Sequence, residues 1–141
     1  MPKRSSQARW QGSLKEGQGT MKLGSGAYEG AYSFPSRFES GDGTNPEELI
    51  AAAHAGCFSM ALSAGLGKAG FTPTSIHTTA TVHLEPVDGG FGITRIDLVT
   101  EAEIPEISET EFQAQAKGAK ENCPVSKVLS GADITLQATL K

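Results

Sequence analysis

A long segment with almost no charge lies between Glu48 and Lys68, near the middle of this chain. Asn45 is a residue type that caps helices, Pro46 suits the first helical position, and Glu47 and Glu48 fall in the first turn, where the helix dipole favours negative charge. Glu48 also completes a capping-box spacing with Asn45. Apolar residues then recur at helical spacing until glycines end the pattern near residue 70. A helix this apolar on all sides is expected to be central, covered by a sheet or by a partner subunit.

Strands and two shorter helices are expected around this segment. Ser108 and Glu111 form a capping box that opens a helix through residue 121, and Cys123-Pro124 opens a short helix to about residue 129. Asp88-Gly89-Gly90 is typical of a hairpin turn. Runs of extended or alternating residues predict strands at 8–14, 19–23, 27–34, 76–86, 92–104 and 133–140. The class is therefore α+β, with antiparallel strands at both ends of the chain around a helical middle. Residues 1–141 are expected to form a single domain.

The composition excludes several classes of function. A formal net charge of −4 argues against nucleic acid as a partner. We expect that no apolar stretch approaches the roughly 20 residues of a membrane-spanning helix, so no membrane association is expected. The charged N-terminal residues lack the apolar core of a secretion signal. We therefore expect a cytoplasmic protein.

The two cysteines, Cys57 and Cys123, are the residues best suited to chemistry. Cys57 lies inside the apolar segment, and Cys123 directly precedes a proline. In a reducing compartment two such cysteines are more often free thiols than a structural crosslink. Each could be a small buried hydrophobic residue. Two thiols that meet in space can instead open and close a disulfide, which is a redox device.

Two other patterns are weaker. Residues 65–70 match G-x-G-x-x-G, but a dinucleotide-binding loop opens a helix, whereas this one closes a helix. His54 and Cys57 share a helical face and could ligate a metal, yet a zinc site needs three or four ligands. We therefore expect neither a metal nor a cofactor. His54 could act as a base for Cys57, but its alanine-rich surroundings favour a packed core histidine.

A thiolate in an apolar helix needs a cation nearby, and Arg37 is the best candidate. It stands between Phe34 and Phe38, which should draw it from the surface toward the core. A carboxylate would fix its orientation, and Glu47 or Glu48 could serve. Ten residues separate Glu47 from Cys57, which at about 100° per residue places them about 80° apart around the helix axis. Glu48 points to the opposite side, so Glu47 is the better partner.

The sequence as a whole resembles the OsmC (osmotically inducible protein C) branch of the OsmC/Ohr family. The resemblance is carried by residues 44–62, by Arg37 between its aromatic neighbours, by the link at 70–75 and by the turn at 122–126. It implies antiparallel sheets wrapped around long central helices in an intertwined homodimer, with active sites at the subunit interface. It also implies a cysteine-based peroxidase that reduces organic hydroperoxides, and hydrogen peroxide more weakly, in oxidative and osmotic stress defence.

The same resemblance assigns roles to four residues. Cys57 matches the cysteine that attacks the peroxide, and Cys123 the one that resolves the resulting sulfenic acid as a disulfide. Arg37 and Glu47 match the pair that activates the thiolate. The family is not known for a bound cofactor, and a dihydrolipoyl-type dithiol is the associated reductant.

A hydrocarbon tail on the substrate would suit an apolar neighbourhood, for which the sequence offers Phe34, Phe38, Phe58 and Met60. Two alternatives remain open at this point. The protein could be a thiol redox sensor, which would oxidise without sustained turnover. It could also be a non-catalytic, stress-induced binding protein whose cysteines merely pack.

Overall fold

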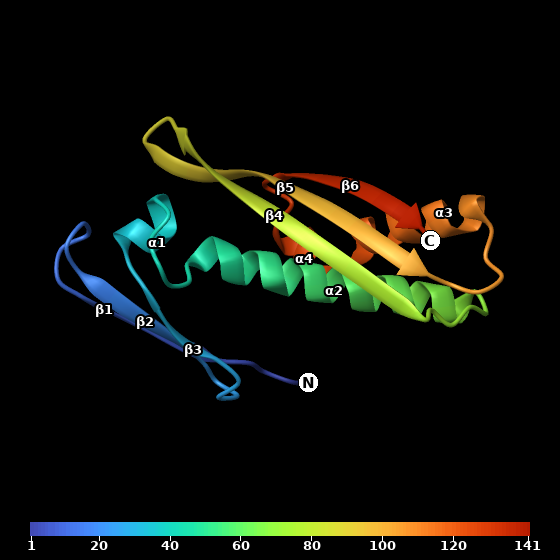
Figure 1. Ribbon diagram of the computed structural model, residues 1–141, viewed down its shortest axis with the longest axis horizontal. Coiled ribbons are helices and arrows are strands. Elements are labelled where there is room, and N and C mark those ends of the chain that lie inside the picture. The colour runs from blue at the N-terminus through green and yellow to red at the C-terminus, as the bar shows by residue number, and fades with distance from the viewer. The chain divides into compact units, whose positions relative to one another are not determined.

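A computed structural model describes all 141 residues, which form two compact units, Met1–Leu49 and Ile50–Lys141 (Figure 1). Both units are mixed in secondary structure: each contains one three-stranded sheet and helical residues. The expected α+β class is confirmed. The expectation of a single domain over residues 1–141 stays a prediction, and the units are described one at a time.

The first unit is a meander of three short strands, β1 (Ser6–Gln11), β2 (Gln18–Leu23) and β3 (Glu29–Tyr32), paired antiparallel in that order. Gly19 in β2 lies opposite both Trp10 and Tyr32. A Cβ atom at Gly19 would lie 2.6 Å from the Tyr32 ring and 2.7 Å from the Trp10 ring. The glycine therefore lets the two rings meet over β2, with their centroids 5.3 Å apart.

A short helix, α1 (Phe34–Phe38), follows β3 where the sequence predicted a strand through residue 34. Ser33 caps it: the Ser33 side chain accepts from the Ser36 N–H, and the Ser36 hydroxyl accepts from the Ser33 N–H. Pro35 sits in the first turn, where its missing N–H costs nothing. The prediction of a strand through residue 34 is wrong, because Pro35 lies in the first turn of a helix instead of following a strand.

The long helix α2 (Pro46–Lys68) begins and ends as the sequence predicts. Asn45 Oδ1 accepts the Glu48 N–H at 2.7 Å. The reciprocal half of the expected capping box is replaced, because the Glu48 carboxylate accepts from the Thr44 hydroxyl at 2.8 Å. At the other end Gly70 has φ = +93°, and the N–H groups of Gly70 and Phe71 return to the carbonyls of Gly67 and Leu66.

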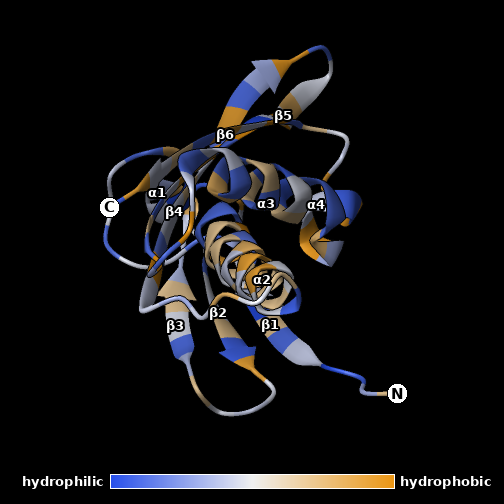
Figure 2. Cartoon of the chain, turned by 90° about the vertical axis from the view of Figure 1, so that its right-hand side faces the viewer, coloured by the Kyte–Doolittle hydropathy of each residue, from blue (hydrophilic) through white to orange (hydrophobic).

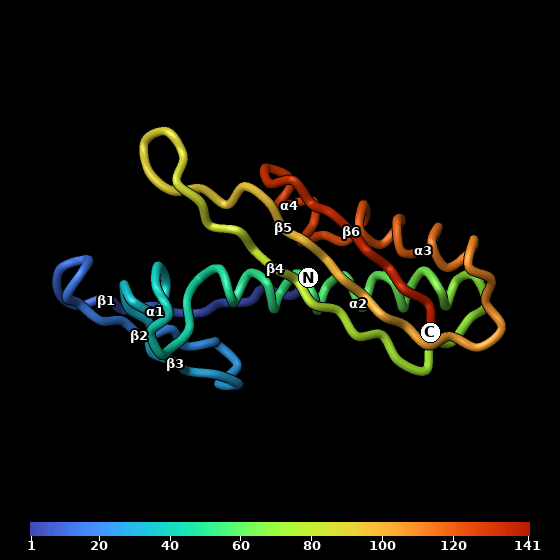
Figure 3. The backbone as a smooth tube through the Cα atoms, turned by 45° about the horizontal axis from the view of Figure 1, so that its top comes forward, coloured from blue at the N-terminus to red at the C-terminus, as the bar shows by residue number.

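The second unit consists of a sheet with helices packed on it. The strands are β4 (Ser75–Val87), β5 (Gly90–Glu103) and β6 (Asp133–Leu140), and the helices after β5 are α3 (Glu109–Asn122) and α4 (Pro124–Val128). A tight turn at the predicted glycines joins β4 to β5 antiparallel. The path of the chain in Figure 3 shows α3 and α4 connecting β5 to β6.

The prediction that the strands at both ends of the chain are antiparallel is wrong for β6, which pairs parallel with β5. A hairpin reverses the chain and yields an antiparallel neighbour. The α3–α4 connection instead brings the chain back beside the earlier part of β5, so that β6 runs in the same direction as β5. A helical crossover joins parallel strands in this way.

The core of the second unit lies between the sheet, α2 and α3. Its fully buried members come from all three: Phe58, Leu62 and Leu66 of α2, Leu98 and Ala102 of β5, and Phe112 and Ala116 of α3. Apolar colours predominate along α2 in Figure 2, whereas α3 also carries hydrophilic residues. The sheet covers one side of α2, as expected, whereas the other side of this helix is exposed.

By length and composition, α2 is apolar enough to cross a membrane, although 22% of the qualifying window is buried inside the chain. The expectation that no segment approaches this length is therefore wrong. A core helix passes the same test, and one side of α2 is in the core described above. The absence of membrane association stays a prediction.

Candidate active site

In the first unit, Arg37 and Glu47 form a two-pronged ion pair. Arg37 Nε donates to Glu47 Oε1 at 2.8 Å, and Arg37 Nη2 donates to Glu47 Oε2 at 3.1 Å. The Glu47 side chain is 9% exposed and that of Arg37 is 36% exposed. Two bonds in this fork geometry fix the guanidinium plane. The remaining N–H donors stay free for a further acceptor.

The connection between α1 and α2 holds this pair in place. The Ser36 hydroxyl donates to the Thr44 carbonyl at 2.7 Å, and Asn45 Nδ2 donates to the Ser36 carbonyl at 3.0 Å. Asn45 therefore caps α2 and ties α1 to it at the same time. Because Arg37 is on α1 and Glu47 is in the first turn of α2, these bonds set the distance between them. Glu48, the alternative partner, pairs with Thr44 instead.

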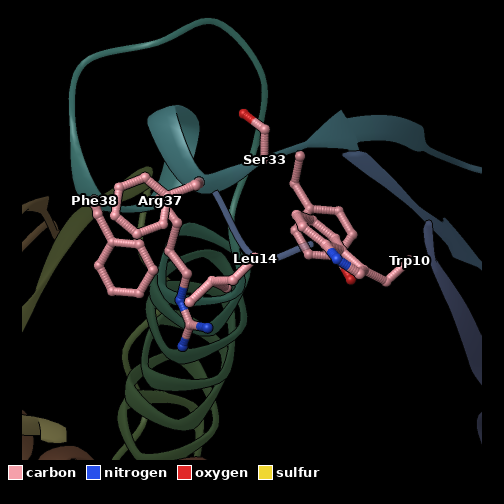
Figure 4. Close-up of a pocket in the computed structure, with 7 residues that line it drawn as sticks. Trp10, Leu14, Ser33, Arg37 and Phe38 are labelled. Atoms are coloured by element: carbon pink, nitrogen blue, oxygen red, sulfur yellow. The ribbon is translucent and has the colours of Figure 1, made fainter. Parts of the chain in front are cut away.

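Arg37 also lines a cavity of ≈ 220 Å³ in the first unit. Figure 4 shows its side chain between Phe38 and Leu14, with Trp10 on another side. The guanidinium carbon lies 5.2 Å from the centroid of the Phe38 ring. The other walls are Tyr32, Ser33 and Phe34. The cavity thus combines one cation with a mainly aromatic lining.

This cavity revises the expected apolar neighbourhood. Of the four expected residues, Phe34 and Phe38 line this cavity, whereas Phe58 is fully buried in the core of the second unit and Met60 is exposed on α2. Trp10 and Tyr32 were missed. They become neighbours through Gly19, and a glycine opposite two aromatics is the signal that could have found them.

In the second unit, the sulfur atoms of Cys57 and Cys123 lie 2.7 Å apart, within hydrogen-bonding distance. Both cysteines are free thiols. Cys57 is partly exposed on α2, and Cys123 is fully buried where α3 ends and α4 begins. A disulfide requires a separation of about 2.05 Å, so a small movement joins the two sulfurs.

The two thiols differ in their surroundings. Burial raises the pKa of Cys57, and the hydrogen bond with Cys123 raises it further. Burial also raises the pKa of Cys123, but hydrogen bonding with Cys57 and with the backbone and side chain of Ser126 outweighs it, so that the Cys123 pKa is lowered. One negative charge on this pair is therefore stabilised at the start of α4.

His54 is buried on α2, as expected for a core histidine, and its Nε2 lies 2.7 Å from the Ser126 hydroxyl. Ser126 was not singled out in the sequence, and a serine three residues after a cysteine gives no distinctive pattern. No group of three or more His, Cys, Asp or Glu side chains is placed to hold a metal ion.

The site residues thus form a close pair of thiols in the second unit and an arginine–carboxylate pair in the first. The structure brings Cys57 to Cys123, and Arg37 to Glu47. The catalytic roles of the four residues remain proposals.

Comparison with known proteins identifies the family. Residues 39–138 match the model of the OsmC-like protein family. The chain is 55% identical to peroxiredoxin OsmC of Escherichia coli over 96% of its own length and 94% of that protein. It is 35% identical to the organic hydroperoxide resistance protein of Xanthomonas axonopodis over 68% of the chain and 67% of the relative.

A crystal structure of an organic hydroperoxide resistance protein OsmC from Legionella pneumophila has a similar fold, with a TM-score of 0.73 and 25% identity. The match covers 96% of both chains. The chain belongs to the OsmC family.

Proposed function

We propose that this protein reduces organic hydroperoxides to alcohols with the Cys57 thiol and closes a Cys57–Cys123 disulfide in each cycle. Its class, a peroxidase, follows from 55% identity over 96% of the chain to a protein named peroxiredoxin. The observation that carries the mechanism is the 2.7 Å separation of the two sulfurs. A dithiol pair at this distance can be oxidised and reduced without rearrangement of the fold.

The difference in exposure supports different roles for the two cysteines. Cys57 is partly exposed and can meet a peroxide, whereas Cys123 is fully buried and lies against Cys57. The Cys57 thiolate attacks one peroxide oxygen, the O–O bond breaks, and the alkoxide leaves as the alcohol after taking up a proton. Cys57 is then a sulfenic acid.

The second step forms the disulfide. The Cys123 thiolate attacks the Cys57 sulfur, the S–O bond breaks, and hydroxide leaves with a proton as water. A dithiol then reduces the disulfide by exchange and becomes a disulfide itself. We propose a dihydrolipoyl-type dithiol for this step. The sum is one hydroperoxide and one dithiol converted to an alcohol, water and one disulfide.

Arg37 is proposed to activate the first thiolate. Burial raises the Cys57 pKa, so the attacking form needs a cation beside it. Glu47 occupies two donors of Arg37 and leaves the others for a sulfur or a peroxide oxygen. This role requires Arg37 to reach a Cys57 of the same or a second copy of the chain.

The aromatic cavity beside Arg37 suits a substrate that has a hydrocarbon tail and a polar end. Its ≈ 220 Å³ is enough for a small organic group. Trp10, Phe34 and Phe38 would contact the tail, and the free donors of Arg37 would contact the peroxide oxygens. Hydrogen peroxide has no tail to bind, so it is the poorer substrate.

We propose a homodimer because α2 has an exposed face without charge. One face of this helix is exposed over several turns and carries only small or apolar residues: Ala52, Ala53, Gly56, Met60, Ser63, Ala64 and Gly67. The Met60 side chain is 76% exposed. A second copy of the chain would cover this face and complete the burial of the helix. We place the protein in the cytoplasm, where a dithiol reductant is at hand.

A steady-state assay tests the proposed function. The purified protein is supplied with dihydrolipoamide and either cumene hydroperoxide or hydrogen peroxide, and alcohol formation is followed. The proposal predicts sustained turnover and a higher kcat/KM for cumene hydroperoxide. A single oxidation without turnover would favour a redox sensor, and unchanged thiols would favour a binding protein.

A further inference from the structure

His54 is a buried imidazole that makes one hydrogen bond. The residue is 0% exposed, its Nε2 lies 2.7 Å from Ser126 Oγ, and its Nδ1 is buried without a partner. Burial lowers the pKa of His54, so the ring is neutral. A polar atom left unpaired in the interior is costly, and an apolar side chain of similar shape would avoid that cost. The hydrogen bond to Ser126 is therefore the feature that sets His54 apart from a residue that only fills space in the core.

Ser126 links His54 to the dithiol. His54 lies three residues before Cys57 on α2, and Ser126 lies three residues after Cys123 on α4, so their 2.7 Å hydrogen bond joins the two helices beside the sulfurs. Hydrogen bonding from the Ser126 N–H and hydroxyl also lowers the pKa of Cys123. A hydroxyl has a single hydrogen, so when it is given to the sulfur the Ser126 oxygen must accept from His54 Nε2–H. The network thus assigns the proton of His54 to Nε2 and leaves Nδ1 as the unpaired acceptor. The direction of donation runs from His54 through Ser126 to Cys123.

We propose that His54 and Ser126 are positioning residues that hold the Cys123 sulfur as a hydrogen-bond acceptor facing Cys57, ready for disulfide formation. This inference rests on the proposed function. The Cys123 thiolate attacks the sulfenic sulfur of Cys57, forming the S–S bond as the S–O bond breaks. The Cys123 thiol has lost one proton, and the released hydroxide takes up one proton. Water therefore leaves. The first step, at the more exposed Cys57, does not use this network.

The groups that act on Cys123 come from two helices. Cys57 is on α2, while Val125 and Ser126 are on α4, and hydrogen bonding from their backbone N–H groups also lowers the Cys123 pKa. Replacing Ser126 by alanine removes the hydroxyl and keeps both N–H donors. Ser126→Ala therefore isolates the link to His54, and Ser126→Thr restores a hydroxyl. Ser130→Ala deletes an exposed hydroxyl just beyond α4 and is the matched control.

The test is a single turnover with one equivalent of cumene hydroperoxide and no reductant. At successive times, the sulfenic acid that remains is trapped with dimedone. The loss of trappable sulfenic acid measures disulfide formation. Ser126→Ala should form sulfenic acid at the rate of the unsubstituted protein but close the disulfide about tenfold more slowly. Ser126→Thr and Ser130→Ala should close it at the original rate. Disulfide closure by Ser126→Ala at the original rate would overturn the proposal.

Variants of His54 separate positioning from packing. His54→Gln keeps an N–H donor near the position of Nε2 and should close the disulfide faster than His54→Leu. His54→Leu combined with Ser126→Ala should be no slower than Ser126→Ala, because both act through one hydroxyl. Additive slowing in the double variant would contradict this relation. If His54→Leu does not fold, the rate of disulfide closure in His54→Gln is compared with that of the unsubstituted protein. Closure more than tenfold slower in His54→Gln would count against the proposal.

A second readout does not depend on peroxidase activity. In a Cys57→Ser background, the ultraviolet absorbance of the thiolate reports the ionisation of Cys123. Adding Ser126→Ala should raise the Cys123 pKa by about one unit, and adding Ser126→Thr should not. Absence of sulfenic acid in the unsubstituted protein would contradict the proposed function alone. An unchanged Cys123 pKa in Ser126→Ala would contradict the role of Ser126 alone.

Discussion

The sulfur atoms of Cys57 and Cys123 are 2.7 Å apart, although 66 residues separate them in the chain. Cys57 is carried by α2, which is anchored in the core by Phe58 on its next position. Cys123 is held from both sides: its N–H donates to the Ala119 carbonyl at 3.0 Å, and its carbonyl accepts from Lys127 at 3.1 Å. Because Cys123 both ends α3 and begins α4, its backbone has little freedom. The fold therefore keeps the two thiols together before any oxidant arrives.

The ion pair of Arg37 and Glu47 should be sensitive to the shape of the cation as well as to its charge. Arg37→Lys keeps the charge but cannot make two parallel bonds to Glu47. We expect kcat/KM for cumene hydroperoxide to fall about 100-fold, as it does when a donor to a developing anion is lost. Arg4→Lys, at an exposed site, should leave kcat/KM unchanged. Wild-type activity in Arg37→Lys would show that the two parallel hydrogen bonds to Glu47 are dispensable.

Trp10 should determine preference among substrates. Trp10→Ala removes an aromatic wall of the cavity beside Arg37. We expect KM for cumene hydroperoxide to rise about tenfold, equivalent to about 1.4 kcal/mol of binding, with little change for hydrogen peroxide. Trp10→Phe keeps a ring opposite Gly19 and should retain most of the affinity. Equal losses for both peroxides would argue that Trp10 is structural.

Met60 should report on the proposed dimer. Its side chain is exposed on the small-residue face of α2, so a charge there would be buried by a second copy. Met60→Asp is expected to shift the protein from dimer to monomer in sedimentation analysis. Ala114→Asp introduces the same charge on the exposed side of α3 and should leave the dimer intact. A dimer that persists in Met60→Asp would place the interface elsewhere.

Asp97 predicts a dependence of stability on pH at acid values. Hydrogen bonds from Thr135 and His83, followed by Arg95, lower the pKa of Asp97 from 3.8 to about 2. A lowered pKa in the folded state stabilises the fold above the unfolded value, and this contribution is lost as the pH falls through the folded value. The free energy of unfolding should therefore drop between about pH 4 and pH 2.

The matching variants are Asp97→Asn and Asp133→Asn, compared by denaturant unfolding across that range. The drop should be smaller in Asp97→Asn, while Asp133→Asn should behave like the unsubstituted protein. Identical pH profiles for all three proteins would show that the polar group around Asp97 contributes nothing.

Much of this architecture could be predicted because it is encoded locally. The Asn45 cap, the glycines after Lys68 and the Ser108 cap fix helix ends through contacts a few residues long. The face of α2 on which Glu47 lies followed from helix geometry, and the structure pairs that residue with Arg37.

What could not be predicted depends on contacts between distant segments. The pairing of β6 with β5 is set by the path of α3 and α4, which no local pattern specifies. Helix α1 was missed because the second residue of its capping box is Ser36, where the usual sequence pattern has Glu or Gln. Ser126 gained meaning only when α4 placed it against His54, 72 positions earlier in the chain.

The most direct test of the dithiol mechanism is a single turnover read by mass spectrometry. One equivalent of cumene hydroperoxide is added to the reduced protein, and to Cys57→Ser and Cys123→Ser. The unsubstituted protein should yield one equivalent of alcohol and one Cys57–Cys123 disulfide. Cys123→Ser should yield the alcohol with a sulfenic acid on Cys57, and Cys57→Ser should yield no alcohol. Alcohol formation by Cys57→Ser, or an unsubstituted protein that makes alcohol while both thiols stay reduced, would contradict the account.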